Sequence, residues 1–366
     1  MKILFLEPFF GGSHRDFALG YAESSGHEIV LATLPARFWK WRMRGAALHF
    51  FREIESLSPF DAILATDLMG VADFRALFSM RGPVPPIFLY IHENQLTYPL
   101  APGESLDVHF GFTDITSALA ADRLAFNSAT HRDAFLAALP GFINQMPEFL
   151  PTWVPGAVAK KSSVLTPGCR FDPGPLPLAP LPKGPPLVIW NHRWEFDKNP
   201  GDFFAALYAL ADQGLDFHVA LLGENFQFVP KPFLDARERL GDRVAAYGHE
   251  PSREQYLQWL RQGTVVVSTA NQENFGISVV EAVRAGCLPL LPRRLSYPEI
   301  LPEAFHDGFL YDSQVELTEK LAGILTNPRA FARARQELSE AMEVHSWKLR
   351  APEFDAAMEG MVRDGR

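Results

Sequence analysis

Glu273 and Glu281 form the most specific chemical pattern in the chain. Glu273 lies in the loop after a predicted strand over 264–269, and Glu281 lies on the first turns of a predicted helix over 278–285. Eight residues apart, the two carboxylates do not share one helical face. We therefore expect them to contact different parts of an elongated ligand, although capping of the helix by Glu273 is the alternative. A glycine in the loop between them would expose backbone donors where the helix begins. The loop contains Asn274, Phe275 and Gly276.

Arg193 and Lys198 lie in a loop that follows a predicted strand over 186–190. A guanidinium group and an ammonium group that converge on one anion are well suited to a diphosphate. We therefore expect this loop to bind a phosphorylated ligand. The alternative is a pair of surface salt bridges to Glu195 or Asp197.

Two polar segments follow predicted strands in the first half of the chain. Gly11 and Gly12 separate a strand over 3–6 from a helix over 15–24, where backbone N–H groups can approach an anion. A tight turn is the alternative. A strand over 87–91 is followed by four polar side chains, which could bind a ligand. The alternatives are that the histidine is structural and that Glu93 caps the following segment. The four are His92, Glu93, Asn94 and Gln95.

A short segment near the N-terminus contains four cations and three aromatic residues in eight positions, within an otherwise acidic protein. Cations that alternate with aromatic rings suit phosphate contacts and base stacking. The alternative is that the rings cover the core while the arginines extend to solvent. The candidate nucleic-acid contacts in this segment are Arg37, Lys40, Trp41, Arg42 and Arg44.

Short apolar strands alternate with helical stretches on both sides of a proline-rich segment, which predicts two doubly wound α/β domains with buried parallel strands. Eight prolines lie within 167–186, so neither a helix nor a central strand can run through that segment. We expect domains over 1–166 and 187–345, a linker over 167–186, and a helical tail over 346–366 that packs back on the first domain. Ligands of such sheets bind beyond the carboxyl ends of the strands.

Composition narrows the class of protein. The 366 residues are 47% hydrophobic and 21% charged, which is typical of a globular chain, and the net charge is −9. Two cysteines favour a reducing compartment, and no apolar run is long enough for a membrane span or a signal peptide, so we expect a cytoplasmic protein. Dinucleotide, P-loop, nucleophile-elbow and zinc motifs are absent from the sequence, as is any D-x-D pair that would hold a metal-bound nucleotide.

The chain resembles GT-B glycosyltransferases of the large retaining class, because Glu273 and Glu281 match the E-x7-E motif of that class and Arg193 and Lys198 its diphosphate-binding pair. A closer resemblance, from Met1 to about Trp347, is to the tRNA-queuosine α-mannosyltransferase family. The segments that carry it are Gly11-Gly12-Ser13-His14, Leu34-Pro35-Ala36 with Trp39–Arg44, His92-Glu93-Asn94-Gln95-Leu96, His192-Arg193-Trp194-Glu195 with Asp197-Lys198, and Tyr297-Pro298-Glu299-Ile300.

This resemblance implies a GT-B fold, two Rossmann-like domains with an interdomain cleft, and transfer of mannose from GDP-mannose to queuosine in tRNA-Asp with retained configuration. It implies a nucleotide-sugar donor and a tRNA acceptor as partners, no membrane partner, and no metal or other cofactor. It assigns catalytic roles to His92, Glu273, Arg193 and Lys198. The implied donor contacts are Gly11, Gly12, Arg193, Lys198, Asn274, Phe275, Gly276 and Glu281. The implied acceptor contacts are Arg37, Lys40, Trp41, Arg42, Arg44, Glu93, Asn94 and Gln95.

Two other functions remain open from the sequence. A related enzyme could act on a lipid, a saccharide or a small metabolite, but we find no convincing basic amphipathic helix that would face a membrane. A non-catalytic protein could bind a nucleotide sugar or RNA. Against that second alternative, Glu273, Arg193, Lys198 and His92 are all present together.

Overall fold

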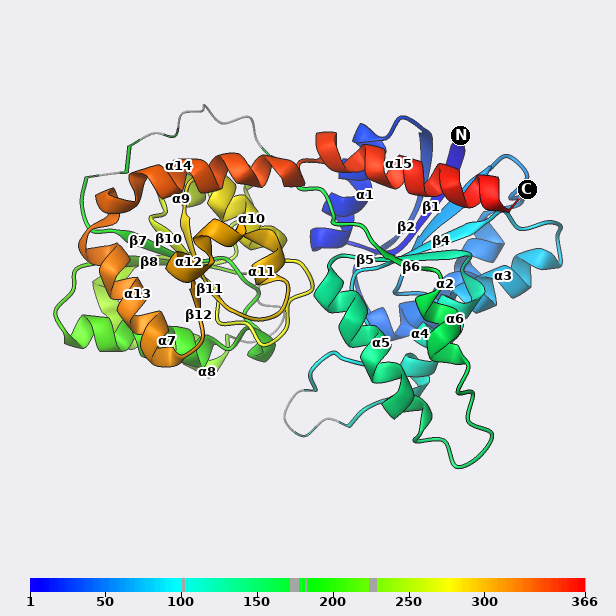
Figure 1. The fold of residues 1–366 in the computed structure, drawn as a ribbon, viewed down its shortest axis with the longest axis horizontal. Coiled ribbons are helices and arrows are strands. Elements are labelled where there is room, and N and C mark those ends of the chain that lie inside the picture. The colour runs from blue at the N-terminus through cyan, green and yellow to red at the C-terminus, as the bar shows by residue number, and fades with distance from the viewer. Residues whose placement is uncertain are drawn as a thin grey trace. The chain divides into compact units, whose positions relative to one another are not determined.

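The computed structural model describes the chain as two compact units, each built on its own six-stranded parallel sheet (Figure 1). Unit 1 comprises Met1–Arg170 and His345–Arg366, and unit 2 comprises Phe171–Val344. The structure describes residues 1–100, 103, 105–171, 178, 180–181, 183–223 and 229–365.

Unit 1 has the strand order β2-β1-β3-β4-β5-β6, and all five pairings are parallel. The strands predicted over the first 126 residues are confirmed, whereas the short edge strand β6 was not predicted because its sequence begins with two serines. The elements are β1 (Lys2–Phe10), α1 (Gly12–Ser24), β2 (Glu28–Pro35), α2 (Trp39–Glu53), β3 (Ala62–Thr66), α3 (Val71–Ser79), β4 (Ile87–Ile91), α4 (Val108–Ala120), β5 (Arg123–Phe126), α5 (Ala129–Ile143), α6 (Val154–Ala159), β6 (Ser162–Val164) and α15 (Trp347–Asp364).

The central strands β3 and β4 of unit 1 are buried at every position, because helices cover both faces of the sheet (Figure 1). Alternate residues of β3 and β4 pack on α1 and α15, and the remaining ones pack on α2 to α6. On the α1 side, Phe17 stacks on Tyr90 with ring centroids 4.5 Å apart. The core of unit 1 therefore extends directly beneath the carboxyl end of β4.

The C-terminal helix α15 belongs to unit 1 although the chain reaches it only after unit 2. Trp347 and Phe354 pack against Phe17 of α1, and the Asp355 carboxylate accepts a hydrogen bond from the Tyr21 hydroxyl. The start of α15 is tied to Cys169 by a short parallel bridge to Ser346. This division places 167–170, the first residues of the predicted linker, in unit 1, and part of that linker lies outside the described residues.

Unit 2 has the strand order β12-β11-β10-β7-β8-β9, again with every pairing parallel. Counted from β7, this is the 3-2-1-4-5-6 order of dinucleotide-binding folds. The elements are β7 (Leu187–Trp190), a 3-10 turn (Phe196–Lys198), α7 (Pro200–Asp212), β8 (His218–Leu222), α8 (Lys231–Leu240), a 3-10 turn (Gly241–Arg243), β9 (Val244–Gly248), α9 (Arg253–Gln262), β10 (Val265–Val267), α10 (Ile277–Arg284), β11 (Leu288–Pro292), α11 (Tyr297–Ile300), a 3-10 turn (Glu303–Phe305), α12 (His306–Phe309), β12 (Leu310–Tyr311), α13 (Gln314–Thr326), a 3-10 turn (Pro328–Phe331), α14 (Ala332–Ala341) and a 3-10 turn (Met342–His345).

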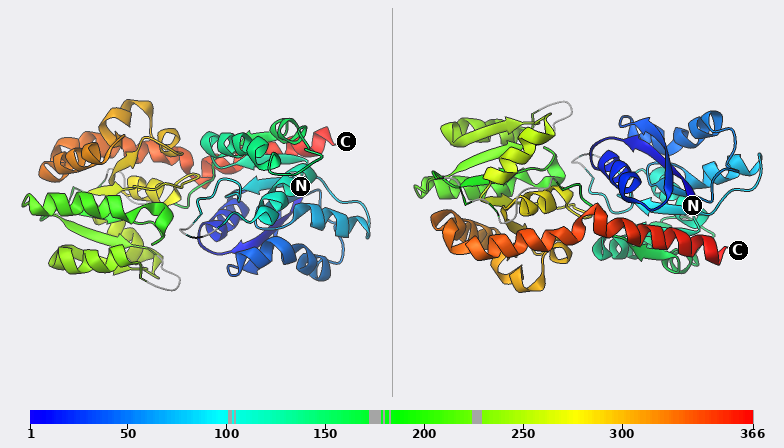
Figure 2. Two further views of the ribbon diagram at one scale, coloured as in Figure 1. Left: turned by 90° about the horizontal axis from the view of Figure 1, so that it is seen from below. Right: turned by 90° about the horizontal axis from the view of Figure 1, so that it is seen from above.

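Helices also cover both faces of the unit 2 sheet, with α7, α8 and α13 on one side and α9, α10 and α14 on the other (Figures 1 and 2). The predicted α/β class with two doubly wound domains is confirmed. None of the described helices combines the length and the apolar character that crossing a membrane requires.

Both sheets reverse the direction of strand addition once, between β1 and β3 in unit 1 and between β7 and β10 in unit 2. Loops diverge at such a switch point, and ligands of doubly wound sheets bind there. The loops that follow these strands contain most of the site residues predicted from the sequence.

Candidate active site

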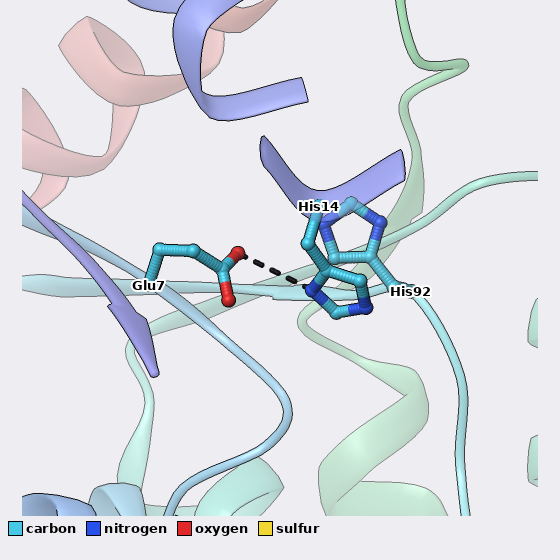
Figure 3. Close-up of side chains that lie close together, drawn as sticks. All are labelled: Glu7, His14 and His92. Atoms are coloured by element: carbon cyan, nitrogen blue, oxygen red, sulfur yellow. Dashed lines mark hydrogen bonds and ion pairs between the residues drawn. The ribbon is translucent and has the colours of Figure 1, made fainter. Parts of the chain in front are cut away.

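The switch point of unit 1 brings Glu7, His14 and His92 together from β1, the first turn of α1 and the loop after β4 (Figure 3). Nδ1 of His14 lies 3.3 Å from Oε2 of Glu7, and the other carboxylate oxygen accepts the backbone N–H of Phe9. The rings of His14 and His92 are 4.2 Å apart between centroids. Glu7 is fully buried and His14 nearly so, so this is a packed polar cluster and not a solvated surface.

The electrostatics of this cluster separate the two histidines. Burial opposes a charge on His14, but Glu7, with smaller contributions from Asp67 and Glu93, raises the pKa of His14 to about 9. Burial and the neighbouring His14 cation lower the pKa of His92 well below its usual value. At neutral pH the cluster therefore contains an imidazolium paired with a carboxylate, beside a neutral imidazole.

Buried carboxylates fix the backbone of the polar loop after β4. Asp67, directly after β3, accepts the backbone N–H groups of His92 and Glu93 at 2.8 and 3.3 Å. Asp114, on α4, accepts the backbone N–H of Gln95 at 2.6 Å. Burial raises the pKa of Asp67 to about 7 and that of Asp114 well above its usual range. The side chains of Glu93 and Gln95 lie on the partly exposed side of the loop.

Asn94, predicted as an acceptor contact, is buried and supports the same loop from within. Its amide nitrogen lies 3.0 Å from Nε2 of His131, whose Nδ1 lies 2.8 Å from the Asn127 side-chain oxygen. The Asn127 amide in turn donates to the carbonyl of His92 at 3.3 Å. Burial lowers the pKa of His131 to about 3, so the whole chain of contacts is neutral.

Glycine is required at the two positions before and at the start of α1 for different structural reasons. A Cβ on Gly11 would lie 2.3 Å from Cβ of Ala36, so only glycine permits this close approach of β1 and β2. Gly12 has φ of +51° and opens the first turn of α1. The tight turn considered from the sequence is therefore present, and the exposed N-terminus of α1 remains open to a ligand.

In unit 2, Lys198 lies at the end of the loop after β7 and is almost completely buried. Its ammonium donates to the carbonyl of Gln272 at 2.6 Å and lies 3.4 Å from Glu273 and 3.3 Å from Asp197. Although burial opposes the charge, these two carboxylates raise the pKa of Lys198. The same ammonium, although burial favours the neutral acid, lowers the pKa of Glu273. The sequence alternative of a surface salt bridge therefore fails for Lys198, because the pair is buried.

Arg193 lies in the same loop and is partly exposed, 3.3 Å from Glu195. The salt bridge considered as an alternative is thus present here, on a side chain that still reaches solvent. Adjacent His192 is buried, and burial together with Lys198 lowers its pKa to about 4. The loop therefore combines an exposed guanidinium with a buried ammonium around a neutral imidazole.

Gly276 adopts φ of +101° as the N-cap of α10, and no side chain caps that helix. Capping by Glu273 is therefore not how the loop is built. Ser296 instead donates to the carbonyl of Phe275 at 2.9 Å, and the ring of Tyr297 lies close to the position that a Cβ on Gly276 would take. Asn274 accepts a hydrogen bond from Gln272 within the loop. The first N–H groups of α10 are left available for a ligand.

Glu281, the fifth residue of α10, is held by groups that sequence reasoning did not identify. Arg253 donates to one of its carboxylate oxygens, and the Tyr256 hydroxyl donates to the other at 3.2 Å. Asn191, directly after β7, donates to the Tyr256 hydroxyl at 3.0 Å. Glu281 is thus separated from the Lys198–Glu273 pair and joined to α9, which agrees with separate contacts along a ligand.

The basic segment begins with Arg37 before α2, continues through the first turns of that helix, and divides into two parts. Arg42 and Arg44 donate to the carbonyls of Pro35 and His109, so both secure local structure. Arg37 and Lys40 are exposed, and the Trp41 ring is 77% exposed. The ring of Trp39 packs on Phe110, which is the core-covering role considered as the alternative. A surface of Arg37, Lys40 and Trp41 remains for a ligand.

Sequence reasoning missed several polar residues because each is ordinary in isolation and becomes informative only through its contacts. Glu7 and His14 were visible as part of the Gly-Gly segment but received no role. The others come from elements that are adjacent in space and distant in sequence. They are Asp67, Asp114, Asn127, His131, Asn191, Arg253 and Tyr256.

Glu7, His14 and His92 bring potential ligand atoms within 4.8 Å of one another. We assign them as an ion pair beside a neutral ring, because Glu7 is already engaged by His14 and by the Phe9 N–H. Within the described ranges, no other cluster of histidine, cysteine and acidic side chains has this spacing.

Comparison with known proteins identifies the family. Residues 2–169 match the family model of the tRNA-queuosine alpha-mannosyltransferase N-terminal domain, and residues 179–343 match that of group 1 glycosyl transferases. A Drosophila melanogaster tRNA-queuosine alpha-mannosyltransferase is 35% identical over 348 residues, which is 92% of this chain and 90% of the relative. The chain belongs to the tRNA-queuosine alpha-mannosyltransferase family. The resemblance inferred from the sequence is confirmed, and the protein is a glycosyltransferase.

Solved structures of other members of the fold support the same architecture. A sucrose-phosphate synthase from Thermosynechococcus elongatus has a TM-score of 0.72 at 14% identity, with all of each chain covered. An Anabaena HepE complex with UDP and glucose has a TM-score of 0.64 at 16% identity, also with full coverage. These likenesses show that this mannosyltransferase-family chain has the GT-B glycosyltransferase fold.

Proposed function

We propose that the protein transfers mannose from GDP-mannose to queuosine in tRNA-Asp with retained configuration and without a metal ion. The observation that carries this proposal is the 35% identity, over nine-tenths of both chains, to a relative named tRNA-queuosine alpha-mannosyltransferase. The site geometry supports it, because it offers cations for a diphosphate and an exposed aromatic and basic surface for RNA.

The donor binds to unit 2 at the switch point between β7 and β10. Arg193 and Lys198 contact the diphosphate and stabilise the charge that develops on the leaving group. In a metal-dependent enzyme a divalent ion would carry this role, so two permanent cations support a metal-independent reaction. Burial of Lys198 strengthens its interaction with the phosphate, because water screens it little.

The remaining donor contacts follow from the loop that leads into α10. Glu281 binds the ribose hydroxyls, and Glu273 with the N–H groups beside Gly276 orients the hexose. As the family resemblance implies, we also assign Gly11 and Gly12 as donor contacts and His92 as a contact of the hexose. Each group fixes one part of the donor, so that the anomeric carbon is held in a reactive position.

We assign no protein side chain as nucleophile or general base. In same-face transfer, the bond from the anomeric carbon to the phosphate oxygen breaks and the acceptor hydroxyl bonds to that carbon on the same side. The departing phosphate oxygen accepts the hydroxyl proton. Retention then needs no covalent intermediate, and the protein contributes binding, orientation and charge.

The acceptor tRNA binds to unit 1 through Arg37, Lys40 and Trp41. The two cations contact phosphates, and the indole offers an exposed face for stacking on an unpaired base. Glu93 and Gln95, whose partial exposure is compatible with this role, contact the nucleoside. A tRNA acceptor also implies a cytoplasmic location.

The test is transfer of radiolabel from GDP-mannose to purified tRNA that contains or lacks queuosine. We expect label on the queuosine-containing tRNA alone. Slow release of GDP without label on either tRNA would leave a glycosyltransferase with another acceptor, such as a lipid, saccharide or metabolite. The absence of both label and GDP release would contradict the donor and lead to other nucleotide sugars.

A further inference from the structure

His14, which is buried, and His92, which is partly exposed, are two imidazoles in direct contact, an arrangement that disfavours two charges at once. Their ring centroids are 4.2 Å apart and the planes are inclined by 45°. Two cations at that distance, shielded from water, repel each other strongly. One proton must therefore be assigned to one of the two rings.

Glu7 decides which ring takes the proton. Its carboxylate contacts Nδ1 of His14, while the other nitrogen of His14 points away from Glu7 (Figure 3). The Phe9 N–H holds the second carboxylate oxygen, so the carboxylate has no freedom to move to His92. A carboxylate that binds one imidazole favours protonation of that ring, and the proton belongs to His14.

Charged groups on neighbouring elements also favour protonation of His14 over protonation of His92. Asp67 from the end of β3 and Glu93 from the loop after β4 add to the attraction that favours a charge on His14. Repulsion from His131 of α5 acts on His92 only when His131 is itself protonated, because burial lowers the pKa of His131 to about 3. The rings of Phe17 and Tyr90 also pack against His92, which remains partly exposed.

We propose that Glu7 and His14 are positioning residues that keep His92 neutral and fix the orientation of its ring. This inference rests on the proposed function, in which His92 contacts the hexose. Glycosyl transfer develops positive charge at the anomeric carbon. A charged imidazole next to the hexose would raise the energy of that state, whereas a neutral ring can hydrogen-bond a hexose hydroxyl without opposing it.

The matched variants are Glu7→Gln, His14→Gln and, as a control, Glu55→Gln, which removes an equal charge from an exposed position of unit 1. Without Glu7, His14 gives up its proton near neutral pH and no longer repels a charge on His92. The pKa of His92 then rises. We expect the acid limb of kcat/KM for Glu7→Gln to move up by about one pH unit or more relative to that of Glu55→Gln.

Histidine ring NMR of the full-length, donor-free protein tests the proposal without any substrate. In the unchanged protein we expect one buried histidine to titrate near pH 9 and to disappear in His14→Gln, while the His92 signal stays neutral down to pH 5. In Glu7→Gln the His14 titration moves below pH 7, and in Glu55→Gln nothing moves.

Two outcomes would overturn the proposal. One is a His92 signal that titrates above pH 6 in the unchanged protein. The other is a Glu7→Gln enzyme whose pH profile superimposes on that of Glu55→Gln. If Glu7→Gln does not fold, His14→Gln serves in its place, since it removes the same repulsion from His92. Failure of transfer from GDP-mannose would contradict the proposed function while leaving the titration result valid.

Discussion

The two switch-point sites of the molecule use different kinds of charge. In unit 1 the site is built from His14, His92 and His131 among buried carboxylates, so its charge depends on where protons lie. In unit 2 the functional cations are Lys198 and Arg193, which remain charged at any physiological pH. The difference indicates that the positive charge of unit 2 attracts an anionic donor at every physiological pH. In unit 1 the charges of the histidines, and therefore their contacts, depend on pH.

The largest effect is expected for Lys198→Met, because this change leaves Asp197 and Glu273 buried together without their cation. Loss of both donor binding and leaving-group stabilisation should decrease kcat/KM by about 1,000-fold or more. Lys231→Met, on an exposed lysine of the same unit, is the control. Steady-state kinetics with GDP-mannose would check this, and a decrease below tenfold would show that unit 2 does not depend on that charge.

Glu273→Gln keeps the shape of the side chain and removes its charge. We expect kcat to decrease by about 100-fold, because the hexose loses an orienting carboxylate and Lys198 loses a partner. GDP affinity should change little or increase, since the ammonium then attracts the diphosphate more strongly. Calorimetry with GDP separates the two effects, and a strong loss of GDP affinity would contradict this assignment.

Unit 1 should be acid-sensitive through His131, whose pKa in the folded state is about 3. Because the unfolded chain takes up a proton near pH 6.5 and the folded one does not, stability decreases as pH falls below 6.5. Between pH 7 and pH 5 this costs about 2 kcal/mol. His131→Gln should reduce the fall in melting temperature over that interval, and an unchanged pH dependence would be evidence against a neutral buried His131.

The combined change Arg37→Ala and Lys40→Ala should raise the KM for tRNA about tenfold and leave GDP-mannose hydrolysis unchanged. The slope of log affinity against log salt should decrease by about 1.5, as expected for two lost phosphate contacts. Lys231→Ala with Arg329→Ala is the matched control on exposed residues of unit 2. Equal tRNA affinity in both double variants would show that Arg37 and Lys40 do not bind tRNA.

The smallest effect is expected for Tyr256→Phe, which deletes one hydrogen bond to Glu281. We expect a three- to fivefold higher KM for the donor and an unchanged kcat, since the carboxylate keeps its contact with Arg253. Tyr208→Phe on α7 is the control. An equal rise in KM for both variants would mean that Tyr256 does not position Glu281.

Much of the fold could be predicted from the sequence because both sheets are built from short, continuous apolar strands with polar residues directly after them. The loops at Arg193, Glu273 and His92 were found in this way. The contacts that give each side chain its role could not be predicted, because they join distant elements. Asn94 is a polar residue among other polar residues directly after a strand, as a ligand contact would be. Its amide nevertheless faces His131 on α5.

The basic segment shows the same limit within eight residues. Spacing alone does not separate Arg42 and Arg44, which hold backbone carbonyls, from Arg37 and Lys40, which are exposed. That separation depends on where Pro35 and His109 lie in space. For the same reason β6 escaped prediction, because its pairing with β5 and not its own composition makes it a strand.

The most direct test of this division of labour is to measure GDP binding and tRNA binding in the same two proteins, Lys198→Met and the double variant Arg37→Ala with Lys40→Ala. We expect the first to lose GDP affinity and keep tRNA affinity, and the second to do the reverse. If either protein loses both affinities while remaining folded, the assignment of the donor to unit 2 and of the acceptor to unit 1 is wrong.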